Sequence, residues 1–240
     1  MSDNFEYFFL ETVSSTNGEI KKIYNAQSSK NSLALFSNSQ LHGKGRSENK
    51  WISKPGDFTA SYLLNENFTT LSLGQLNIVV SVTILKAIKT LYKNIPFKLK
   101  WPNDIIVNDK KIGGILLESK IHRDVVEFII IGLGLNIISS PNDKKYKTTK
   151  ISDYSNYIDN KYLFKLVGDL LIKYVGEFKR EGFDFFQDEW IKNSRDVGKF
   201  VNIKSNKKSY YGKFLNIDDQ GSLILQINSG TMKFLYGELI

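Results

Sequence analysis

Apolar residues recur at helical spacing in two long stretches of the chain. From Leu73 to Leu91 they fall three or four residues apart, and the same spacing returns between Leu163 and Phe178. This periodicity places the apolar side chains on one face, which predicts two amphipathic helices that pack against a core. A shorter helix is predicted across Phe185 to Lys192.

Short runs of β-branched and aromatic residues predict strands between these helices. They cover Tyr7 to Leu10, Leu33 to Ser37, Phe58 to Leu64, Phe97 to Trp101 and Val125 to Ile131. The last run is almost wholly apolar, as is typical of a strand that is buried on both faces. We therefore expect it at the centre of a sheet.

The stretch K-W-P-N-D-I-I-V-N-D-K-K-I-G-G-I-L-L-E-S, residues 100–119, predicts a β-hairpin. Ile105 to Val107 form one arm, and Ile112 to Leu117 form the return arm. Between them, Asn108 and Asp109 are turn residues that tolerate a left-handed backbone. The hairpin is the element around which we place the rest of the chain.

Both ends of this hairpin carry residues that suit a binding pocket. Pro102 biases the preceding backbone towards extended geometry, so Asn103 and Asp104 should lie at a strand end, where their oxygens can face a ligand. Gly113 and Gly114 weaken a strand unless another group must approach the backbone closely. We interpret these glycines as one wall of a pocket.

The pattern changes past Arg195 to short strands separated by turn residues. These strands are Phe200–Ile203, Tyr210–Leu215, Leu223–Ile227 and Met232–Tyr236. Such spacing predicts a small β-barrel, so we divide the chain into residues 1–195 and a small domain of residues 196–240. Upstream, Ser139 to Tyr154 has little apolar periodicity. We expect this segment to be a mobile surface loop that a bound ligand can order.

Composition narrows the classes of function. The chain has 240 residues, 41% of them hydrophobic, enough for one substantial core and a small satellite domain. It has no cysteine, which removes disulfides, thiolate metal sites and cysteine nucleophiles, and we expect a cytoplasmic protein. His42 and His122 lie far apart, which disfavours a zinc site or a Ser-His-Asp triad. The apolar runs are short and the N-terminus lacks a basic start, so no membrane association is expected.

The formal net charge of +8 and the pI near 9.3 suit an anionic partner such as a nucleotide, a nucleic acid or an acidic protein. Charge alone does not choose among these three. The lysines are spread along the chain and mixed with asparagine, which favours a general compositional bias over a dedicated nucleic-acid face.

Two polar stretches are candidates for ligand contacts. Ser14 to Asn17 open a predicted helix, and Thr16 with Glu19 has the spacing of a capping box. These groups can cap the helix, and a helix N-terminus can also offer donors to a small polar ligand. In the second stretch, Gly43 to Arg46, two glycines bracket a lysine so that backbone amides can approach a phosphate. It does not have Walker-loop spacing, and on its own it is more typical of a mobile surface loop.

Taken together, these motifs resemble those of biotin protein ligases. The resemblance rests on K-W-P-N-D, the following K-x-G-G-I-L-L-E, the upstream G-K-G-R-x-x-N-x-W and the Ser-Thr-Asn opening, in order from about Ser14 to Asn136. The terminal Gly237-Glu238 and the short strands before it are similar to the small C-terminal domain of that family. The chain starts almost directly at the catalytic motifs, so neither a DNA-binding helix-turn-helix nor transcriptional repression is expected.

The resemblance implies an α+β fold, a mixed β-sheet backed by helices, followed by an SH3-like C-terminal barrel. It implies a reaction in which biotin and ATP, with Mg²⁺, give biotinoyl-5'-AMP, and a lysine of a biotin carboxyl carrier protein or domain, from acetyl-CoA carboxylase or a related carboxylase, then attacks the mixed anhydride. No covalent enzyme intermediate is needed, so catalysis would depend on positioning and charge stabilisation. Both a monomer and a homodimer are compatible with the family, and no DNA partner is expected.

The resemblance also implies roles for individual residues. Biotin binding is implied for Ser15, Thr16, Asn17, Gln40, Lys44, Gly45, Arg46, Lys111 and Gly114. ATP binding is implied for Gly43, Lys44, Arg46, Trp51, Asn103, Lys111 and Asn136. The catalytic residues implied are Arg46, Lys111 and Asp104, and Asn103 and Asp104 are the implied magnesium ligands. Two alternatives stay open: Trp51 could belong to the core instead, and Asp104 could help the incoming amine lose its proton.

The chain departs from the family pattern in its glycine-rich loop. Ser47, Glu48 and Asn49 stand where many members carry more arginine, which weakens the expected grip on the adenylate. No motif in Ser139 to Tyr154 indicates which residues cover the adenine. Two rival interpretations remain: a lipoate-type ligase of the same fold, and a non-enzymatic module that binds nucleic acid through its basic surface.

Overall fold

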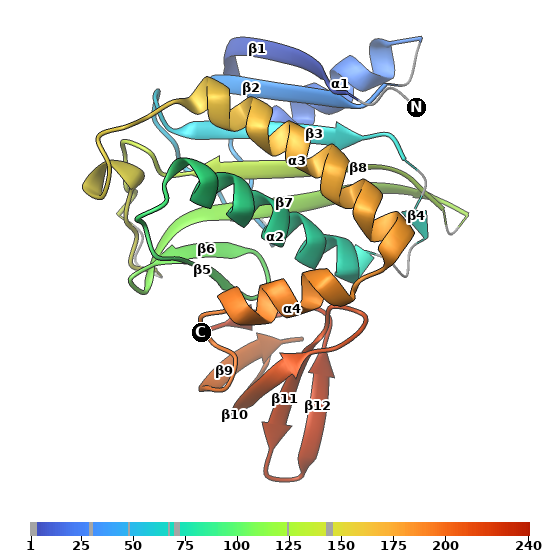
Figure 1. Ribbon diagram of the computed structural model, residues 1–240, viewed down its shortest axis with the longest axis vertical. Helices are drawn as coiled ribbons and strands as arrows, with labels where there is room; N and C mark the ends of the chain where they lie inside the picture. Colours follow the sequence, from blue (N-terminus) through green and yellow to red (C-terminus); the bar gives the residue numbers. More distant parts are fainter. Residues whose placement is uncertain are drawn as a thin grey trace.

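The computed structural model describes residues 4–28, 31–47, 49–66, 68–69, 73–123, 125–142 and 146–240. In these residues the chain forms an eight-stranded mixed sheet covered by helices, with a second, five-stranded sheet at the C-terminal end (Figure 1). The predicted fold class of a mixed sheet backed by helices is confirmed. Glu48, and residues 143–145 of the predicted loop, lie outside the described residues.

The large sheet has the strand order β1-β2-β3-β8-β7-β6-β5, and β4 pairs with β8. Its strands are β1 (Glu6–Val13), β2 (Leu33–Gln40), β3 (Phe58–Leu64), β4 (Phe68–Thr69), β5 (Phe97–Lys100), β6 (Asp104–Val107), β7 (Lys110–His122) and β8 (Val125–Leu135). Only the β1–β2 pairing is parallel in the described sheet. The apolar run predicted as a central strand is β8, which lies between β3 and β7.

Alternating side chains of the strands enter two different cores. In β2, Leu33 and Leu35 join a cluster with α1 (Thr16–Ala26), whereas Ala34 and Phe36 join the larger core. That larger core includes α2 (Leu73–Leu91) and α3 (Asn160–Glu181), which cross the front of the sheet in Figure 1. Because successive side chains of a strand point to opposite faces, the sheet is buried on both sides.

Helix α2 has the bounds predicted from its periodicity, but it is more apolar than the sequence interpretation allowed. Among the described residues it is the one helix long and apolar enough to cross a membrane, and 61% of the relevant window is buried inside the protein. It packs against α3 and against α4 (Asp184–Asn193). This burial is that of a core helix, which explains its apolar surface all round.

The predicted hairpin is formed by β6 and β7, and its turn residues Asn108 and Asp109 both have the left-handed backbone, with φ of 48° and 59°. The small C-terminal sheet consists of β9 (Phe200–Ser205), β10 (Lys208–Ile217), β11 (Leu223–Ile227), β12 (Gly230–Phe234) and β13 (Glu238–Leu239). Its strand order is β12-β11-β10-β9-β13, and all of its pairings are antiparallel. In the described residues its two end strands do not pair, so the predicted barrel is an open sheet of the SH3-like type.

The C-terminal sheet packs on the large domain through α2 and α4. The side-chain amide of Gln75 donates to the carbonyl oxygen of Asp219 at 2.7 Å, and that of Gln187 donates to the carbonyl oxygen of Ile217 at 2.7 Å. Gly74, in the first turn of α2, faces Gln220, and a Cβ atom added to Gly74 would overlap the Gln220 carbonyl oxygen. The two parts therefore meet backbone to backbone at this glycine.

We predict that Gly74→Ala destabilises the protein by about 1–3 kcal/mol, because the added methyl group must push the β10–β11 turn away. Gly176→Ala in α3 is the matched control: there the nearest atom to an added Cβ is the flexible Arg180 guanidinium, at 3.4 Å. The control should gain up to about 1 kcal/mol of stability from the better helix propensity. Urea unfolding of both variants measures the difference, and equal stability of the two would contradict the packing assigned to Gly74.

Candidate active site

One cavity of about 730 Å³ opens between the large sheet and the C-terminal sheet. All but one of the residues implied by the sequence resemblance line it. They are Ser15, Thr16, Asn17, Gln40, Lys44, Gly45, Arg46, Trp51, Asn103, Asp104, Lys111, Gly114 and Asn136. Segments far apart in the sequence thus form a single site, as the motif interpretation requires.

Helix α1 points its N-terminus into one end of the cavity. Its N-cap is Ser15, whose side chain makes no capping bond, and the side chain of Glu19 binds Lys22 instead. The oxygen Oε1 of Gln40 accepts from the backbone amide of Thr16 at 2.8 Å and from its hydroxyl at 3.0 Å. The predicted capping box is therefore wrong, because a side chain from β2 satisfies the helix end that Glu19 was expected to satisfy.

The side chain of Asn17 is fixed by three neighbouring strands. Its Oδ1 accepts from the hydroxyl of Ser61 on β3 at 2.6 Å, and its Nδ2 donates to Glu118 on β7 at 2.7 Å. Between them lies Gly132 of β8, where an added Cβ would stand 2.6 Å from Asn17 Oδ1. Because its oxygen and its nitrogen are both engaged, Asn17 anchors α1 to the sheet and so fixes the direction of Ser15 and Thr16.

The glycine-rich stretch forms a small hairpin of its own. Lys44 and Lys50 pair as an antiparallel bridge, and the amide of Trp51 donates to the carbonyl oxygen of Gly43 at 2.9 Å. A Cβ on Gly43 would overlap the Trp51 carbonyl oxygen, and Gly43 does not line the cavity. The lack of a side chain at Gly43 lets the two arms meet, and the ATP contact expected for it stays a prediction.

Arg46 connects this hairpin to two other parts of the chain. Its Nη1 donates to Asn103 Oδ1 at 3.4 Å and to the carbonyl oxygen of Gly237 at 3.3 Å. Burial lowers the pKa of the Arg46 guanidinium, while the nearby charges of Asp104 and Glu238 oppose that change. The guanidinium therefore lies in a partly desolvated position where it can strengthen the binding of an anion.

Lys111 and Asp104 form an ion pair on adjacent strands, with 2.6 Å between Lys111 Nζ and Asp104 Oδ1. Asp104 pairs with Gly114 across β6 and β7, so no side chain at 114 separates the two charged groups. A Cβ on Gly114 would lie 3.5 Å from both Lys111 Cε and the Trp51 ring. Of the two predicted wall glycines, Gly114 lines the cavity, whereas Gly113 is packed against Leu135.

Trp51 lies on the glycines of the central strands and lines the cavity rather than belonging only to the core. A Cβ on Gly134 would overlap its indole ring, and Lys111 Nζ stands 5.9 Å from the centre of a Trp51 ring. The indole nitrogen is buried and has no hydrogen-bond partner in the described structure. A buried donor without an acceptor costs free energy, and a ligand that accepts a hydrogen bond from the indole nitrogen would remove that cost.

Two asparagines that were expected to contact the nucleotide are held by the backbone. Asn103 Nδ2 donates to the carbonyl oxygen of Ile115 at 2.6 Å, and Asn136 Nδ2 donates to that of Thr149 at 3.0 Å. Both side chains therefore have fixed orientations before any ligand arrives. Asn136 is almost fully buried at the end of β8.

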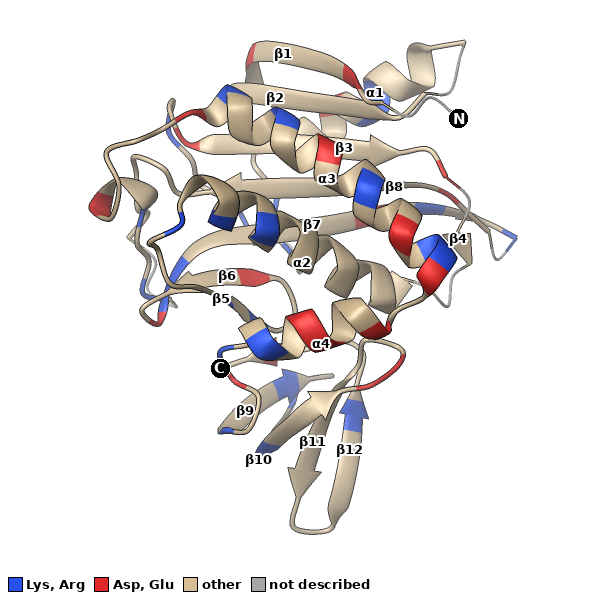
Figure 2. Cartoon of the chain, in the orientation of Figure 1, with Lys and Arg blue, Asp and Glu red and all other residues tan. Residues whose placement is uncertain are grey.

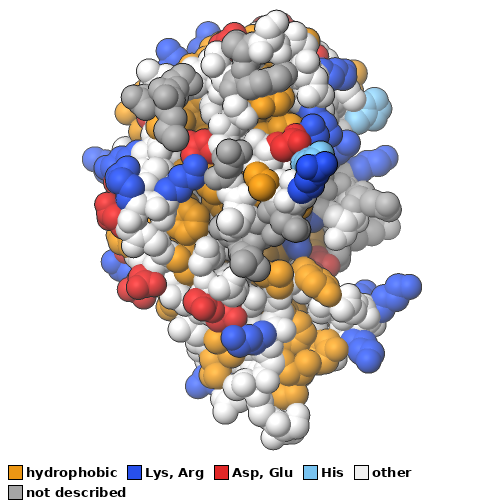
Figure 3. Space-filling view, turned by 90° about the vertical axis from the view of Figure 1, so that its right-hand side faces the viewer, with side chains coloured by type: hydrophobic (Ala, Val, Ile, Leu, Met, Phe, Trp, Pro, Cys, Tyr) orange, Lys and Arg blue, Asp and Glu red, His pale blue; other side chains and the backbone are white. Residues whose placement is uncertain are grey.

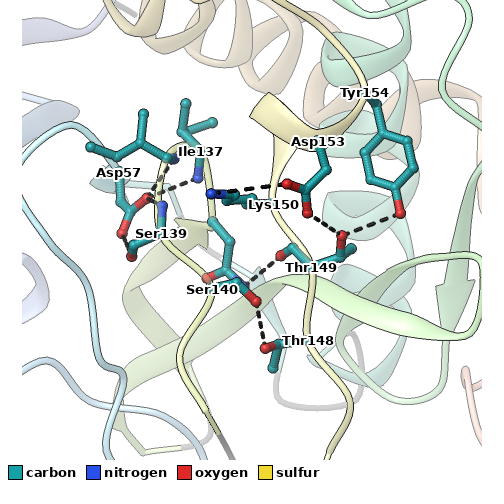
Figure 4. Close-up of polar contacts among 11 residues, drawn as sticks. Asp57, Ile137, Ser139, Ser140, Thr148, Thr149, Lys150, Asp153 and Tyr154 are labelled. Carbon is teal, nitrogen blue, oxygen red and sulfur yellow. Dashed lines mark hydrogen bonds and ion pairs between the residues drawn. The ribbon is translucent and has the colours of Figure 1, made fainter.

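The segment after β8 is anchored in the described residues rather than loose. Asp57 Oδ1 accepts from the backbone amides of Ile137, Ile138 and Ser139 at 2.9 to 3.0 Å, and Oδ2 accepts from the Ser139 hydroxyl (Figure 4). Three consecutive amides around one carboxylate form an anion nest inside the protein. Of these three residues only Ser139 belongs to the segment expected to be a mobile loop, and a distant carboxylate anchors the start of that segment.

Further along, the same segment runs beside Lys111. The amide of Lys111 donates to Lys147 O at 2.8 Å, and the amide of Thr149 donates to Lys111 O at 3.0 Å. Figure 4 shows Thr149 in turn bonded to Asp153, which belongs to a short 3₁₀ helix, Ile151–Asp153. This pairing brings Tyr146 over the cavity, with Lys111 Nζ 5.5 Å from the centre of its ring.

Sequence reasoning assigned no role to Tyr146 or Lys100, and it named none of the residues through which the C-terminal sheet lines the cavity. The C-terminal sheet supplies Lys204, Ser205, Asn206, Tyr236, Gly237, Glu238 and Leu239. The charged side chains of the described lining are Lys44, Arg46, Lys50, Lys100, Lys111 and Lys204 against Asp104 and Glu238. This excess of positive charge in a concave site attracts an anionic ligand.

Magnesium has few protein donors here. The described residues contain no group of three histidine, cysteine, aspartate or glutamate side chains that could hold a metal ion. Asp104 is the carboxylate beside Lys111, and the Oδ1 atom of Asn103 accepts from Arg46. Such a donor set fits Mg²⁺ only as the companion of substrate phosphates, which bring most of its oxygen ligands.

We predict that Gly132→Ala loosens the first turn of α1, because the new Cβ must displace the Asn17 amide. Overpacking of about 1–3 kcal/mol should speed hydrogen exchange at the Thr16 and Glu19 amides by about tenfold. Gly18→Ala is the matched control, since its Cβ would meet nothing closer than Ser15 Cβ at 3.9 Å.

A double-mutant cycle with Asn17→Ala checks the cause of this loosening. Once the amide is removed, Gly132→Ala should add no further exchange. Additive effects of the two substitutions would show that Gly132 is not there to accommodate Asn17.

Comparison with known proteins agrees with this geometry. Residues 9–136 match the biotin/lipoate A/B protein ligase family, and residues 197–238 match the biotin protein ligase C terminal domain. The chain is 27% identical to the bifunctional ligase/repressor BirA of Bacillus subtilis, over 95% of this chain and 72% of that protein. It is 25% identical to the biotin--[acetyl-CoA-carboxylase] ligase of Paracoccus denitrificans, over 92% and 94%.

Among solved structures, the biotin protein ligase of Aquifex aeolicus in complex with biotin and ATP superposes with a TM-score of 0.82 and 27% identity, covering 98% of both chains. The match of residues 9–136 to the ligase family spans more than half of the chain. It contains the α1 N-terminus, the glycine-rich hairpin and the Lys111–Asp104 pair. The chain belongs to the biotin/lipoate A/B protein ligase family.

Proposed function

We propose that this protein is a biotin protein ligase, which activates biotin with ATP and transfers it to a lysine of a carrier protein. The observation that carries the proposal is the cavity that has the capped end of α1 on one side and the Arg46, Lys111 and Asp104 charges on the other. The Aquifex relative is described as a complex with biotin and ATP, and it matches this chain over almost its whole length.

The first half-reaction joins biotin to the α-phosphorus of ATP. A carboxylate oxygen of biotin attacks that phosphorus, the bond to the β-phosphoryl oxygen breaks, and the electron pair leaves with pyrophosphate. We assign the biotin head group to Ser15, Thr16 and Gln40, whose polar groups surround the helix N-terminus. Lys111 and Arg46 then face the developing phosphate charge, and their preorganised positions lower the barrier.

The second half-reaction requires a carrier lysine that has lost its proton. Asp104 is bonded to Lys111 in the described structure, at 2.6 Å. Asp104 therefore lies beside the cation that we assign to the phosphate, where its carboxylate can accept a hydrogen bond from the incoming amine. We therefore favour Asp104 as the group that assists the incoming amine over a role confined to magnesium, which arrives with ATP. The amine attacks the carbonyl carbon, and AMP leaves.

We further propose a biotin carboxyl carrier protein or domain as the acceptor, from acetyl-CoA carboxylase or a related carboxylase. The name of the Paracoccus relative specifies that carboxylase as its target. We also propose residues 1–195 and 196–240 as the two domains, and a cytoplasmic location. A monomer and a homodimer both remain open, and the absence of a DNA partner stays a prediction.

The faces drawn in Figures 2 and 3 give no support to the nucleic-acid alternative. Acidic and basic side chains are interspersed along α3, and α4 also carries both kinds (Figure 2). The adjoining face, shown in Figure 3, also places acidic side chains among lysine and arginine, with apolar side chains on the C-terminal sheet. A nucleic-acid interface instead gathers lysine and arginine in one stripe or patch.

Biotin-dependent exchange of pyrophosphate into ATP tests the proposed function, with lipoate and octanoate measured in parallel. We expect exchange with biotin and none above background with the other two acids. Exchange that requires lipoate would move the chain to the lipoate branch of the family. Absence of exchange with any acid, together with salt-sensitive binding to RNA or DNA, would support the nucleic-acid alternative.

We predict that Lys111→Ala lowers the rate of adenylate formation by about a hundredfold or more, because it removes a positioned cation from the developing phosphate charge. Lys110→Ala is the matched control: Lys110 precedes it on the same strand, is exposed and does not line the cavity. Pyrophosphate exchange with saturating biotin measures both variants, and a thermal melt verifies folding. A folded Lys111→Ala protein with the exchange rate of the control would remove Lys111 from the catalytic residues.

A further inference from the structure

Lys100 is the first residue of the K-W-P-N-D motif. It ends β5, its exposed fraction is only 8%, and it lines the cavity. Within the described residues its ammonium has no hydrogen bond or ion pair, and its recorded contact is with the ring of Tyr146, at 5.3 Å from the centroid. The stem of Lys100 is therefore packed into the protein, and its ammonium faces the cavity without a direct partner.

The neighbouring cations differ from Lys100 in having direct partners. Lys111 is paired with Asp104, and Arg46 donates to Asn103 and Gly237. The carboxylate of Asp196, which lies near Lys100, accepts a bidentate pair of hydrogen bonds from Arg195 at 2.7 and 3.0 Å, so it is already paired with another cation. Lys44, Lys50 and Lys204 also line the cavity without a recorded side-chain partner, but they are exposed. Among the described residues, Lys100 is therefore the buried cation of the lining that a ligand can engage without first breaking a hydrogen bond or ion pair.

Opposing effects act on the charge of Lys100. Burial lowers the pKa of its ammonium, and the negative charges of Asp104, Asp196 and Glu238 oppose that change. Lys100 and Lys111 stand 5.3 and 5.5 Å from the centre of the same Tyr146 ring. Both ammonium groups thus lie near one ring of the same cavity, so an anion bound there can contact the two lysines together.

We propose that Lys100 is a further catalytic residue, which binds the pyrophosphate leaving group of the adenylation step. This inference rests on the proposed function. As the bond between the α-phosphorus and the bridging oxygen breaks, the electron pair moves onto pyrophosphate, and a desolvated cation stabilises that added charge. The transfer step uses no pyrophosphate, so Lys100 serves only the first half-reaction.

This separation between the two half-reactions provides the test. Lys100→Met removes the charge and keeps an apolar stem of similar length, and Lys100→Arg restores a cation. Lys98→Met is the matched control, because Lys98 lies on the same strand, is exposed and contacts only the carbonyl oxygen of Lys192, at 3.4 Å. Three quantities are measured: the KM for pyrophosphate in the exchange reaction, the KM for biotin, and the rate of transfer from supplied biotinoyl-5'-AMP to a carrier domain.

For Lys100→Met we expect the pyrophosphate KM to rise by about tenfold, the effect of losing one charge-assisted contact. The biotin KM and the transfer rate should stay within about twofold of the wild type, since neither depends on pyrophosphate. Lys100→Arg should recover most of the pyrophosphate affinity, and Lys98→Met should behave as the wild type.

An unchanged pyrophosphate KM in Lys100→Met would overturn the proposal. So would a transfer rate that falls as much as the exchange rate, which would make Lys100 a structural charge held by Asp104, Asp196 and Glu238. If the wild type shows no biotin-dependent exchange, the proposed function fails. Calorimetric titration of wild type and Lys100→Met with magnesium pyrophosphate still decides the binding claim in that case, and equal affinities would refute it.

Discussion

The site depends on glycines in the two central strands of the sheet. Gly132 of β8 leaves room for the amide of Asn17, and Gly134 of β8 leaves room for the indole of Trp51. A β-carbon at either position would overlap the group that now lies on the backbone, whereas one at Gly114 of β7 would make an ordinary contact with the Lys111 side chain, at 3.5 Å. The floor of the cavity is therefore backbone, onto which side chains from α1, the glycine-rich hairpin and the β6–β7 hairpin are laid.

The described lining of the cavity carries more positive than negative charge, and residues of the C-terminal sheet form one side of it. Arg46 contacts both Asn103 and the carbonyl oxygen of Gly237, so a residue of the glycine-rich hairpin joins the two sheets directly. Glu238, next to that carbonyl, acts electrostatically on Arg46 and on Lys100. The small sheet thus shapes the electrostatics of the site, although the motifs that carry the chemistry lie in the large domain.

The sequence predicted the elements and most of the site because the signals for both are local. The β6–β7 hairpin follows from Asn108 and Asp109, which tolerate the left-handed backbone they adopt, and α2 follows from its apolar period. The motif residues reach the cavity because they stand at the ends of those elements.

What the sequence did not predict depends on contacts between distant segments. Gln40 caps α1 in place of Glu19, which no local spacing reveals. Asp57 binds the backbone of residues 137–139, which anchors the segment that carries Tyr146 over the cavity. Nothing in the composition of either segment indicates its partner, because the carboxylate and the amides meet only after the sheet has formed.

The central claim is that the cavity is one site that joins biotin to AMP without a covalent enzyme intermediate. The most direct measurement is to incubate the purified protein with biotin and magnesium-ATP in the absence of any carrier, denature it, and analyse the small molecules and the protein by mass spectrometry. The account predicts biotinoyl-5'-AMP in an amount that matches the protein, and an unmodified chain. Biotin or AMP attached covalently to the chain as the intermediate, or no adenylate at all, would contradict it.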